Sequence, residues 1–208
     1  MEKKEKLIAQ ISDKNEQIIN FLFDYSYDDF SIFGLLGRNL TLINYGLKEN
    51  NEIFIDKALH NIERMQPSLT AKLSNLSIYS DGLVSFGVLL DYIEKHQVAD
   101  FDQTIFKITG FSAYQSGKYM LQKNNLDFIA GATGIGFYYS HRMDKCEYSH
   151  KYLTEWVSKT FELTKNGIKI YDVHLSSKSE NIINLGLAHG LTSVLKLALK
   201  LNKITVVR

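Results

Sequence analysis

The chain has 208 residues, 45% of them hydrophobic, and a net charge of +1 at neutral pH. These values predict one globular domain over residues 1–208 and exclude a disordered chain or one with a broad basic surface for nucleic acid. A single cysteine (Cys146), a charged N-terminus unlike a secretion signal and the lack of any apolar run of about 18 residues predict a cytoplasmic protein without disulfides or a membrane span.

The first predicted element is a helix over residues 3–24. Its apolar residues recur at helical spacing along one side: Ile8, Ile11, Ile18, Ile19 and Leu22. The chain contains one proline, Pro67, and this scarcity permits long helices elsewhere. No alternating run of Val, Ile and Thr flanks a two-residue turn, so we expect no sheet and predict an all-α fold.

Four later segments share one pattern, in which Gly-x-x-Gly or Gly-x-x-Ser precedes about ten mostly apolar residues. They are GLLGRNLTLINYGL from Gly34, GLVSFGVLLDYI from Gly82, GATGIGFYYSHR from Gly131 and GLTSVLKLALKL from Gly190. The spacing of these glycines leaves room for two helices and two loops in each unit, and more polar second helices are predicted over 51–65, 102–123 and 149–165. Glycine costs about 1 kcal/mol relative to alanine inside a helix. Close approach of inner helices around an axis offsets that cost, so we predict a curved α/α-hairpin array, closed or partly closed into a barrel.

His189 distinguishes the fourth unit from the others. It directly precedes Gly190, where the earlier units have Phe33, Asp81 and Ala130. A role in packing alone would predict a small or apolar residue at this position. Histidine exchanges protons near neutral pH, so the position is a candidate for proton transfer, with a structural histidine as the alternative.

Two stretches carry a resemblance to a known family. LGLAHG is similar to a Gly-x-Ala-His-Gly signature, matched at Gly186, Ala188, His189 and Gly190, and DFIAGATG (127–134) is similar to an Asp-x-x-x-Gly-x-x-Gly segment. With these motifs the chain resembles the lanthionine synthetase C-like (LanC-like) family over essentially its whole length. The resemblance implies an α/α toroid with glycine-rich turns at the inner helix ends. We assign that structural role to Gly34, Gly37, Gly82, Gly131, Gly134, Gly186 and Gly190.

The resemblance also implies a chemistry. Family members add a cysteine thiol of a precursor peptide to dehydroalanine or dehydrobutyrine, which forms a thioether ring. A zinc ion binds the thiol and lowers its pKa, because the thiolate is the attacking species. Attack produces an enolate that must be protonated, and Asp127 and His189 match the family residues suited to this step. For Asp127 a helix-capping role is the alternative.

The sequence departs from the family at the metal. The resemblance implies zinc held by two cysteines and a histidine, including an adjacent Cys-His pair, but this sequence has no such pair and ends at Arg208 after the fourth inner segment. We therefore expect zinc in complete members, none in this chain, and no cyclisation by the isolated chain. We also expect self-association or a second chain to cover the apolar face over 194–201.

His141, Cys146 and His150 lie within ten residues and raise the question of a separate metal site. Their spacing is not a known zinc pattern and a fourth ligand is missing, so a polar connection between helices is the favoured interpretation.

Two other functions are consistent with the same residues. A non-catalytic module would bind a peptide or protein on the concave side of the array. A different α/α-barrel enzyme, such as a glycoside-processing one, would need a pair of carboxylates, for which Asp81 and Asp127 are the candidates.

Overall fold

The computed structural model describes residues 2–25, 31, 33–72, 77–170 and 185–206. The helices are α1 (Glu2–Asp24), α2 (Leu35–Glu49), α3 (Glu52–Lys72), α4 (Gly82–Lys95), α5 (Gln103–Gln122), α6 (Ala132–His141), α7 (Tyr148–Thr160) and α8 (Leu191–Val206). Two short antiparallel strands, β1 (Phe161–Thr164) and β2 (Gly167–Ile170), form a hairpin after α7. The predicted all-α class is confirmed.

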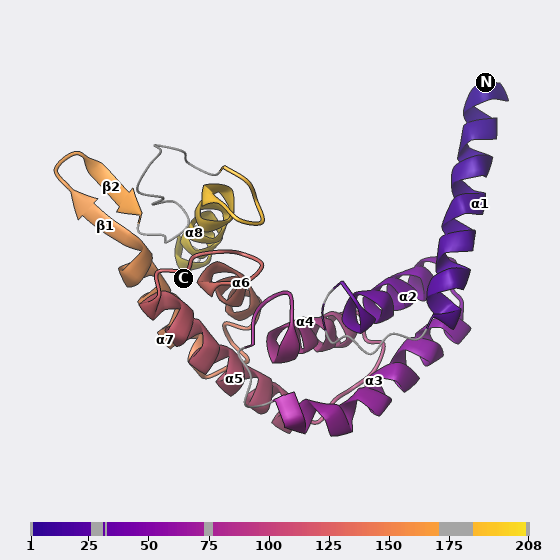
Figure 1. Ribbon diagram of the computed structural model, residues 1–208, viewed down its shortest axis with the longest axis horizontal. Coiled ribbons are helices and arrows are strands. Elements are labelled where there is room, and N and C mark those ends of the chain that lie inside the picture. Colours follow the sequence, from indigo (N-terminus) through magenta and orange to yellow (C-terminus); the bar gives the residue numbers. More distant parts are fainter. Residues whose placement is uncertain (1, 26–30, 32, 73–76, 171–184, 207–208) are drawn as a thin grey trace.

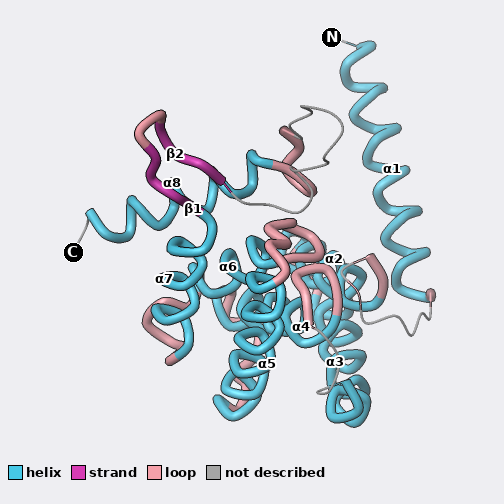
Figure 2. The backbone as a smooth tube through the Cα atoms, turned by 60° about the vertical axis from the view of Figure 1, so that its left-hand side comes forward, coloured by secondary structure: helices cyan, strands magenta, loops and turns pink. Residues whose placement is uncertain are grey.

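The helices form an arc of consecutive α-hairpins. In Figure 1, α2, α4, α6 and α8 lie along the concave side, whereas α3, α5 and α7 lie along the convex side. Neighbouring concave helices contact one another, and each of α2, α4 and α6 contacts the convex helix that follows it. Figure 2 shows the same chain turned by 60°, with α1 extending away from the array. The four glycine-led segments are therefore the inner helices, as predicted.

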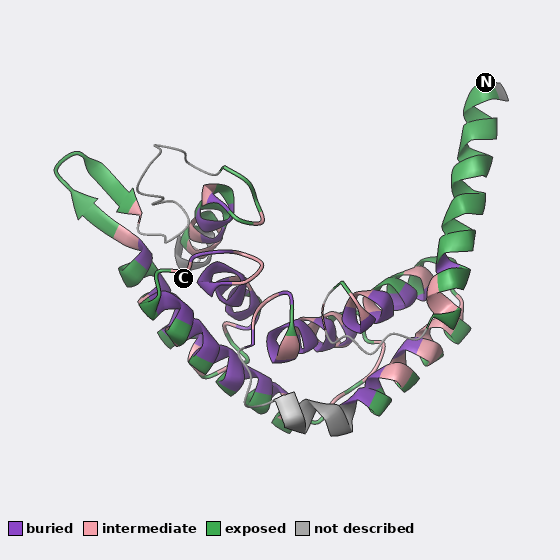
Figure 3. Cartoon of the chain, viewed as in Figure 1, coloured by how far each residue is buried: buried purple, intermediate pink, exposed green. Residues whose placement is uncertain are grey.

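Two apolar cores fill the arc. The first lies between α2, α3 and α4 and includes Leu36, Leu42, Ile43, Ile62, Phe86 and Leu90. The second lies between α4, α5, α6, α7 and α8 and includes Ile135, Tyr138, Tyr139, Tyr152, Trp156 and Leu197. Burial of each large side chain contributes about 1.5–3 kcal/mol. Figure 3 shows that buried residues are concentrated where inner and outer helices face each other.

Buried tyrosines connect the inner and outer helices of the second core. The hydroxyl of Tyr139 on α6 donates to the carbonyl oxygen of Gly110 on α5 (2.6 Å), and that of Tyr152 on α7 donates to Ala132 (2.8 Å). Burial raises the pKa of both hydroxyls. They therefore remain neutral hydrogen-bond donors, and each buried hydroxyl has a backbone carbonyl as its acceptor.

Glycine allows close approach at Gly134, but its close neighbours are loop residues and not the adjacent inner helix that the repeat predicts. A Cβ on Gly134 would collide with the carbonyl oxygen of Phe128 and would lie 2.6 Å from Cβ of Tyr79. The loop before α6 therefore lies directly on the first turn of that helix. The same packing occurs on outer helix α5, where a Cβ on Gly117 would collide with the ring of Tyr152. Gly82 has a positive φ of 74°, which only glycine adopts without strain.

Three sequence expectations need correction. The expectation of no sheet is wrong, because β1 and β2 pair around a tight turn that contains Gly167, whose φ is 123°. The helix predicted over 149–165 ends at Thr160, and its last residues belong to β1 and the turn. The apolar stripe of the first helix is only partly used: Ile19 is buried, whereas Ile8, Ile11 and Ile18 are more than half exposed.

Candidate functional site

Two loops at the start of neighbouring inner helices form the candidate site. One loop precedes α6 and carries Asp127; the other precedes α8 and carries His189. The backbone N–H of Phe128 donates to the carbonyl oxygen of Ala188 (3.1 Å), which fixes one loop against the other. Phe128 follows Asp127 and Ala188 precedes His189, so this hydrogen bond lies beside the two candidate residues.

Asp127 and His189 are in direct contact although they are 62 positions apart in the chain. Nδ1 of His189 lies 2.5 Å from Oδ2 of Asp127. A carboxylate can only accept a hydrogen bond, so Nδ1 carries the proton and Nε2 is the ring nitrogen that Asp127 does not contact. The Asp127 side chain is 5% exposed and that of His189 is 61% exposed. A buried carboxylate thus holds an accessible imidazole.

The position of Asp127 is itself fixed by local hydrogen bonds. Its Oδ1 accepts from the backbone N–H of Ala130 (2.7 Å), and its own N–H donates to Oδ1 of Asn125 (3.1 Å). The N-cap of α6 is Gly131, so the helix-capping alternative for Asp127 is wrong. One carboxylate oxygen stabilises the turn, which leaves the other for His189.

The loop that carries His189 is closed in a similar way. The hydroxyl of Thr192 donates to the carbonyl oxygen of Leu185, and Gly190 is buried at the start of α8. Gly186 and Ala188 lie on the same short loop, which places the whole Gly-x-Ala-His-Gly segment at the mouth of the helix. The backbone on both sides of the imidazole is therefore constrained.

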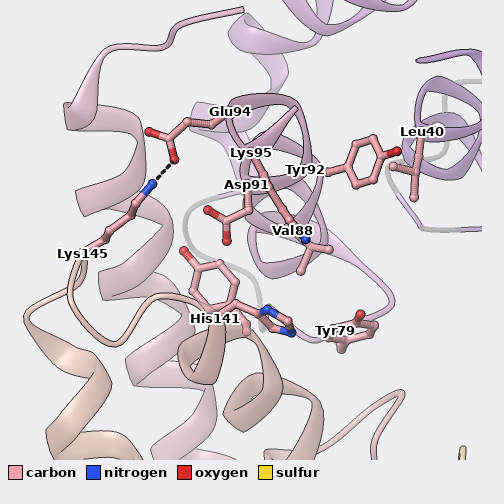
Figure 4. A pocket seen from close by; sticks show the side chains of 10 residues that line it. Leu40, Tyr79, Val88, Asp91, Tyr92, Glu94, Lys95, His141 and Lys145 are labelled. Atoms are coloured by element: carbon pink, nitrogen blue, oxygen red, sulfur yellow. Dashed lines mark hydrogen bonds and ion pairs between the residues drawn. The ribbon is translucent and has the colours of Figure 1, made fainter. Parts of the chain in front are cut away.

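A cavity of about 340 Å³ lies along the inner helices (Figure 4). It is lined by Leu40, Tyr79, Val88, Asp91, Tyr92, Glu94, Lys95, Tyr138, His141 and Lys145. Tyr79 connects it to the loop of Asp127, because its ring lies 4.6 Å from that of Phe128. The cavity thus extends from the start of the inner helices towards their ends.

The sequence raises His141, Cys146 and His150 as candidate metal ligands. Nε2 of His141 instead lies 2.8 Å from Nζ of Lys200, and Sγ of Cys146 lies beside Gly110 of the outer helix α5. Within residues 2–25, 31, 33–72, 77–170 and 185–206, no three His, Cys, Asp or Glu side chains are grouped to hold a metal ion. The described residues therefore do not fit the zinc site of the family.

Asp81 and Asp127 were the candidate carboxylates for a glycoside-processing enzyme, and each of them is bound to other partners. Asp81 is the N-cap of α4 and accepts from the backbone N–H of Gly82 (2.6 Å). Asp127 binds His189 and the turn before α6. Each carboxylate is thus engaged by its own local partners.

The fold and the site define a class: an α/α-repeat protein with a carboxylate–imidazole pair at the start of its inner helices. A family model described as "Lanthionine synthetase C-like protein" matches residues 27–207. The chain therefore belongs to the lanthionine synthetase C-like family, which confirms the resemblance drawn from the two motifs. No curated protein and no solved structure matches the chain. Of the helices that the structure describes, none combines the length and apolar character needed to cross a membrane.

Several charged residues of the cavity were missed by the sequence interpretation. Arg142 is buried against the ring of Phe106 and forms an ion pair with Asp91. Lys95 and Lys145 line the same cavity from α4 and from the loop after α6. These residues come from different helices with no common spacing, so no local pattern could have identified them.

Proposed function

We propose that this chain carries the proton-handling centre of a lanthionine cyclase-type reaction, in which a peptide cysteine adds to dehydroalanine or dehydrobutyrine. Family membership supports the reaction class. The observation that carries the proposal is the 2.5 Å contact between Asp127 and His189 at the mouth of the inner helices. The substrate in this proposal is a dehydrated precursor peptide.

His189 would complete the addition. When a thiolate attacks the β-carbon of the dehydro residue, the electron pair moves towards the α-carbon and the neighbouring carbonyl, which gives an enolate. The protonated imidazole then transfers its Nε2 proton to the α-carbon and becomes neutral, so charge and atoms balance. Asp127 holds Nδ1 and stabilises the imidazolium before this transfer.

Formation of the thiolate is the step that the described residues do not supply. A free cysteine thiol has a reference pKa of about 8.5 and is only slightly ionised at neutral pH. In the family a zinc ion supplies this activation, and the described residues provide no ligand set for it. We therefore expect the chain by itself not to cyclise ordinary cysteine peptides at neutral pH.

A selenocysteine peptide separates the two steps. A selenol is more acidic than a thiol and is ionised at neutral pH without a metal, so only peptide positioning and proton delivery remain. We expect wild-type chain to accelerate ring closure of a dehydrated selenocysteine peptide, and His189→Asn to lose most of a general-acid contribution of about 10²-fold. His60→Asn, at an exposed position on α3, is the matched control.

Ring closure does not change the peptide mass, so the assay must count unreacted thiol or selenol. Alkylation followed by mass spectrometry gives that count for both peptides. No acceleration of the selenocysteine peptide, or equal acceleration by His189→Asn, contradicts the proposal. Ring closure of the cysteine peptide by the chain alone contradicts the expectation that thiolate activation is missing.

A second candidate function is peptide binding without chemistry. The cavity of about 340 Å³ on the inner helices favours it, because Tyr79, Tyr92 and Val88 offer apolar surface beside charged groups. Saturable binding of the dehydrated peptide, with neither peptide reacting faster than in buffer, would support this function over the first.

A further inference from the structure

The acidic groups of the cavity are already neutralised by basic partners. Asp91 forms its ion pair with Arg142, and Oε2 of Glu94 lies 2.7 Å from Nζ of Lys145. Figure 4 shows the Glu94–Lys145 pair as a dashed line, with Asp91 on the same helix as Glu94. Any further positive charge at the cavity is therefore in excess.

That excess comes from three neighbouring inner helices. Lys95, in the last turn of α4, and His141, in the last turn of α6, line the cavity, whereas Lys200 on α8 lies beside it through its contact with His141. Nζ of Lys200 donates to Nε2 of His141 over 2.8 Å, so the imidazole accepts and is neutral in this arrangement. Among the described residues no ion pair involves Lys95 or Lys200.

The cluster costs free energy in the empty protein. Burial lowers the pKa of His141, and the charges of Lys200 and then Lys95 lower it further. Burial, followed by the charge of Lys95, likewise lowers the pKa of Lys200. A basic group in the last turn of a helix is favourable, which applies to Lys95 and His141. Lys200 lies before the last turn of α8, and the helix dipole does not account for two ammonium groups that repel each other across α4 and α8.

We propose that Lys95, His141 and Lys200 form a binding site for a carboxylate carried by the peptide substrate. An incoming carboxylate would relieve the repulsion and accept charge-assisted hydrogen bonds from both lysines. No arginine is among the described residues that line the cavity, so they offer a phosphate no guanidinium for bidentate binding. The identification of the ligand as the peptide substrate rests on the proposed function.

The distance along α6 sets where the acidic residue would lie in the peptide. Asp127 precedes α6 and His141 ends it, and a ten-residue helix is about 15 Å long. An extended peptide advances about 3.3 Å per residue. The carboxylate is therefore expected about four or five residues from the dehydro residue that reacts.

Binding of three matched peptides tests the site. Each is N-acetylated and C-amidated and carries alanine in place of the reacting cysteine; they differ in having Glu, Gln or phosphoserine about five residues from dehydroalanine. By calorimetry at low salt, the Glu peptide should bind wild-type chain about 10-fold more tightly than the Gln peptide. Lys95→Gln and Lys200→Gln should each remove most of this difference, while Lys159→Gln on the outer helix α7 leaves it unchanged.

The outcomes are separable from those of the cyclisation assay, because these peptides bind but cannot form a ring. Equal affinity for the Glu and Gln peptides, or an advantage for Glu that survives in both lysine variants, overturns the site. Tighter binding of phosphoserine than of Glu by more than about 10-fold overturns the choice of carboxylate. If the Glu advantage is present and the selenocysteine peptide does not react, the site stands and the proposed chemistry fails.

Discussion

The backbone N–H of Phe128 donates to the carbonyl oxygen of Ala188, and each of these residues is the sequence neighbour of a member of the Asp127–His189 pair. The 3.1 Å hydrogen bond therefore sets the distance between two loops that begin different helices. A carboxylate–imidazole contact on exposed loops would otherwise be weakened by the entropy of ordering both side chains. Here the backbone supplies that order before any substrate binds.

Asp127→Asn should change which ring nitrogen of His189 carries the proton. The amide of asparagine can still accept from Ala130 through its oxygen, but it then presents an N–H to Nδ1 and forces the proton onto Nε2. Nitrogen-15 NMR of the imidazole should show Nδ1–H in the wild type and Nε2–H in the variant. Asp81→Asn alters the cap of α4 and should leave the His189 tautomer as in the wild type. If the imidazole spectrum of Asp127→Asn is the same as that of the wild type, the contact does not orient the ring.

Gly134→Ala should lower the free energy of unfolding by about 2 kcal/mol or more, because the added methyl group meets the backbone carbonyl of Phe128 rather than a movable side chain. Gly136→Ala on the same helix is the control. Its methyl group would meet the Cδ2 atom of Leu197 at 2.5 Å, which can move. Urea unfolding should show a change of about 1 kcal/mol or less for Gly136→Ala; equal losses in both variants would mean that the loop before α6 is not held against the helix.

Stability should fall as the pH drops below about 6.5, partly because of His141. The pKa of its imidazole is lowered in the fold, chiefly by burial and then by Lys200 and Lys95, so between that value and 6.5 the unfolded chain binds more protons. Unfolding is therefore favoured as the pH falls through this window. In urea titrations at several pH values, His141→Asn should show a smaller loss than wild type, whereas His60→Asn should follow the wild-type curve. If the free energy of unfolding of His141→Asn depends on pH as strongly as that of the wild type, the effect belongs to other groups.

The exposed side of α8 should mediate self-association, although Val194 and Leu197 of the predicted 194–201 face are buried in the second core. Leu195 and Leu199 are four residues apart and therefore lie on one face of the helix; they are 46% and 64% exposed. We expect a concentration-dependent mass in sedimentation equilibrium and a monomer for the double variant Leu195→Lys, Leu199→Lys. Ile53→Lys, at a 65% exposed position on α3, should associate like the wild type. A wild-type chain that stays monomeric at all concentrations would refute this expectation.

The hairpin array and the Asp127–His189 pair could be predicted from the sequence for physical reasons. At Gly134, in one of the Gly-x-x-Gly starts, backbone approaches the first turn of an inner helix, and such a constraint is visible locally in the sequence. His189 stood out because the other three units have no imidazole at that position. The family motifs then pointed to Asp127 as its companion.

Other features depended on contacts between distant residues. Gly117 gave no repeat signal, yet it makes room for the ring of Tyr152 on the neighbouring outer helix α7. Lys95, His141 and Lys200 come from three helices and meet only when the arc forms. The short β1–β2 pair was missed because its strands are only four residues long and alternate weakly.

The configuration of the newly formed α-carbon tests the central claim most directly. If His189 delivers the proton from one side of a bound enolate, ring closure of the dehydrated selenocysteine peptide by the wild-type chain should give predominantly one diastereomer. His189→Asn should give the mixture formed in buffer, because water then supplies the proton from either side. A buffer-like mixture from the wild type, or an unchanged diastereomer ratio in His189→Asn, would contradict proton delivery by the Asp127–His189 pair.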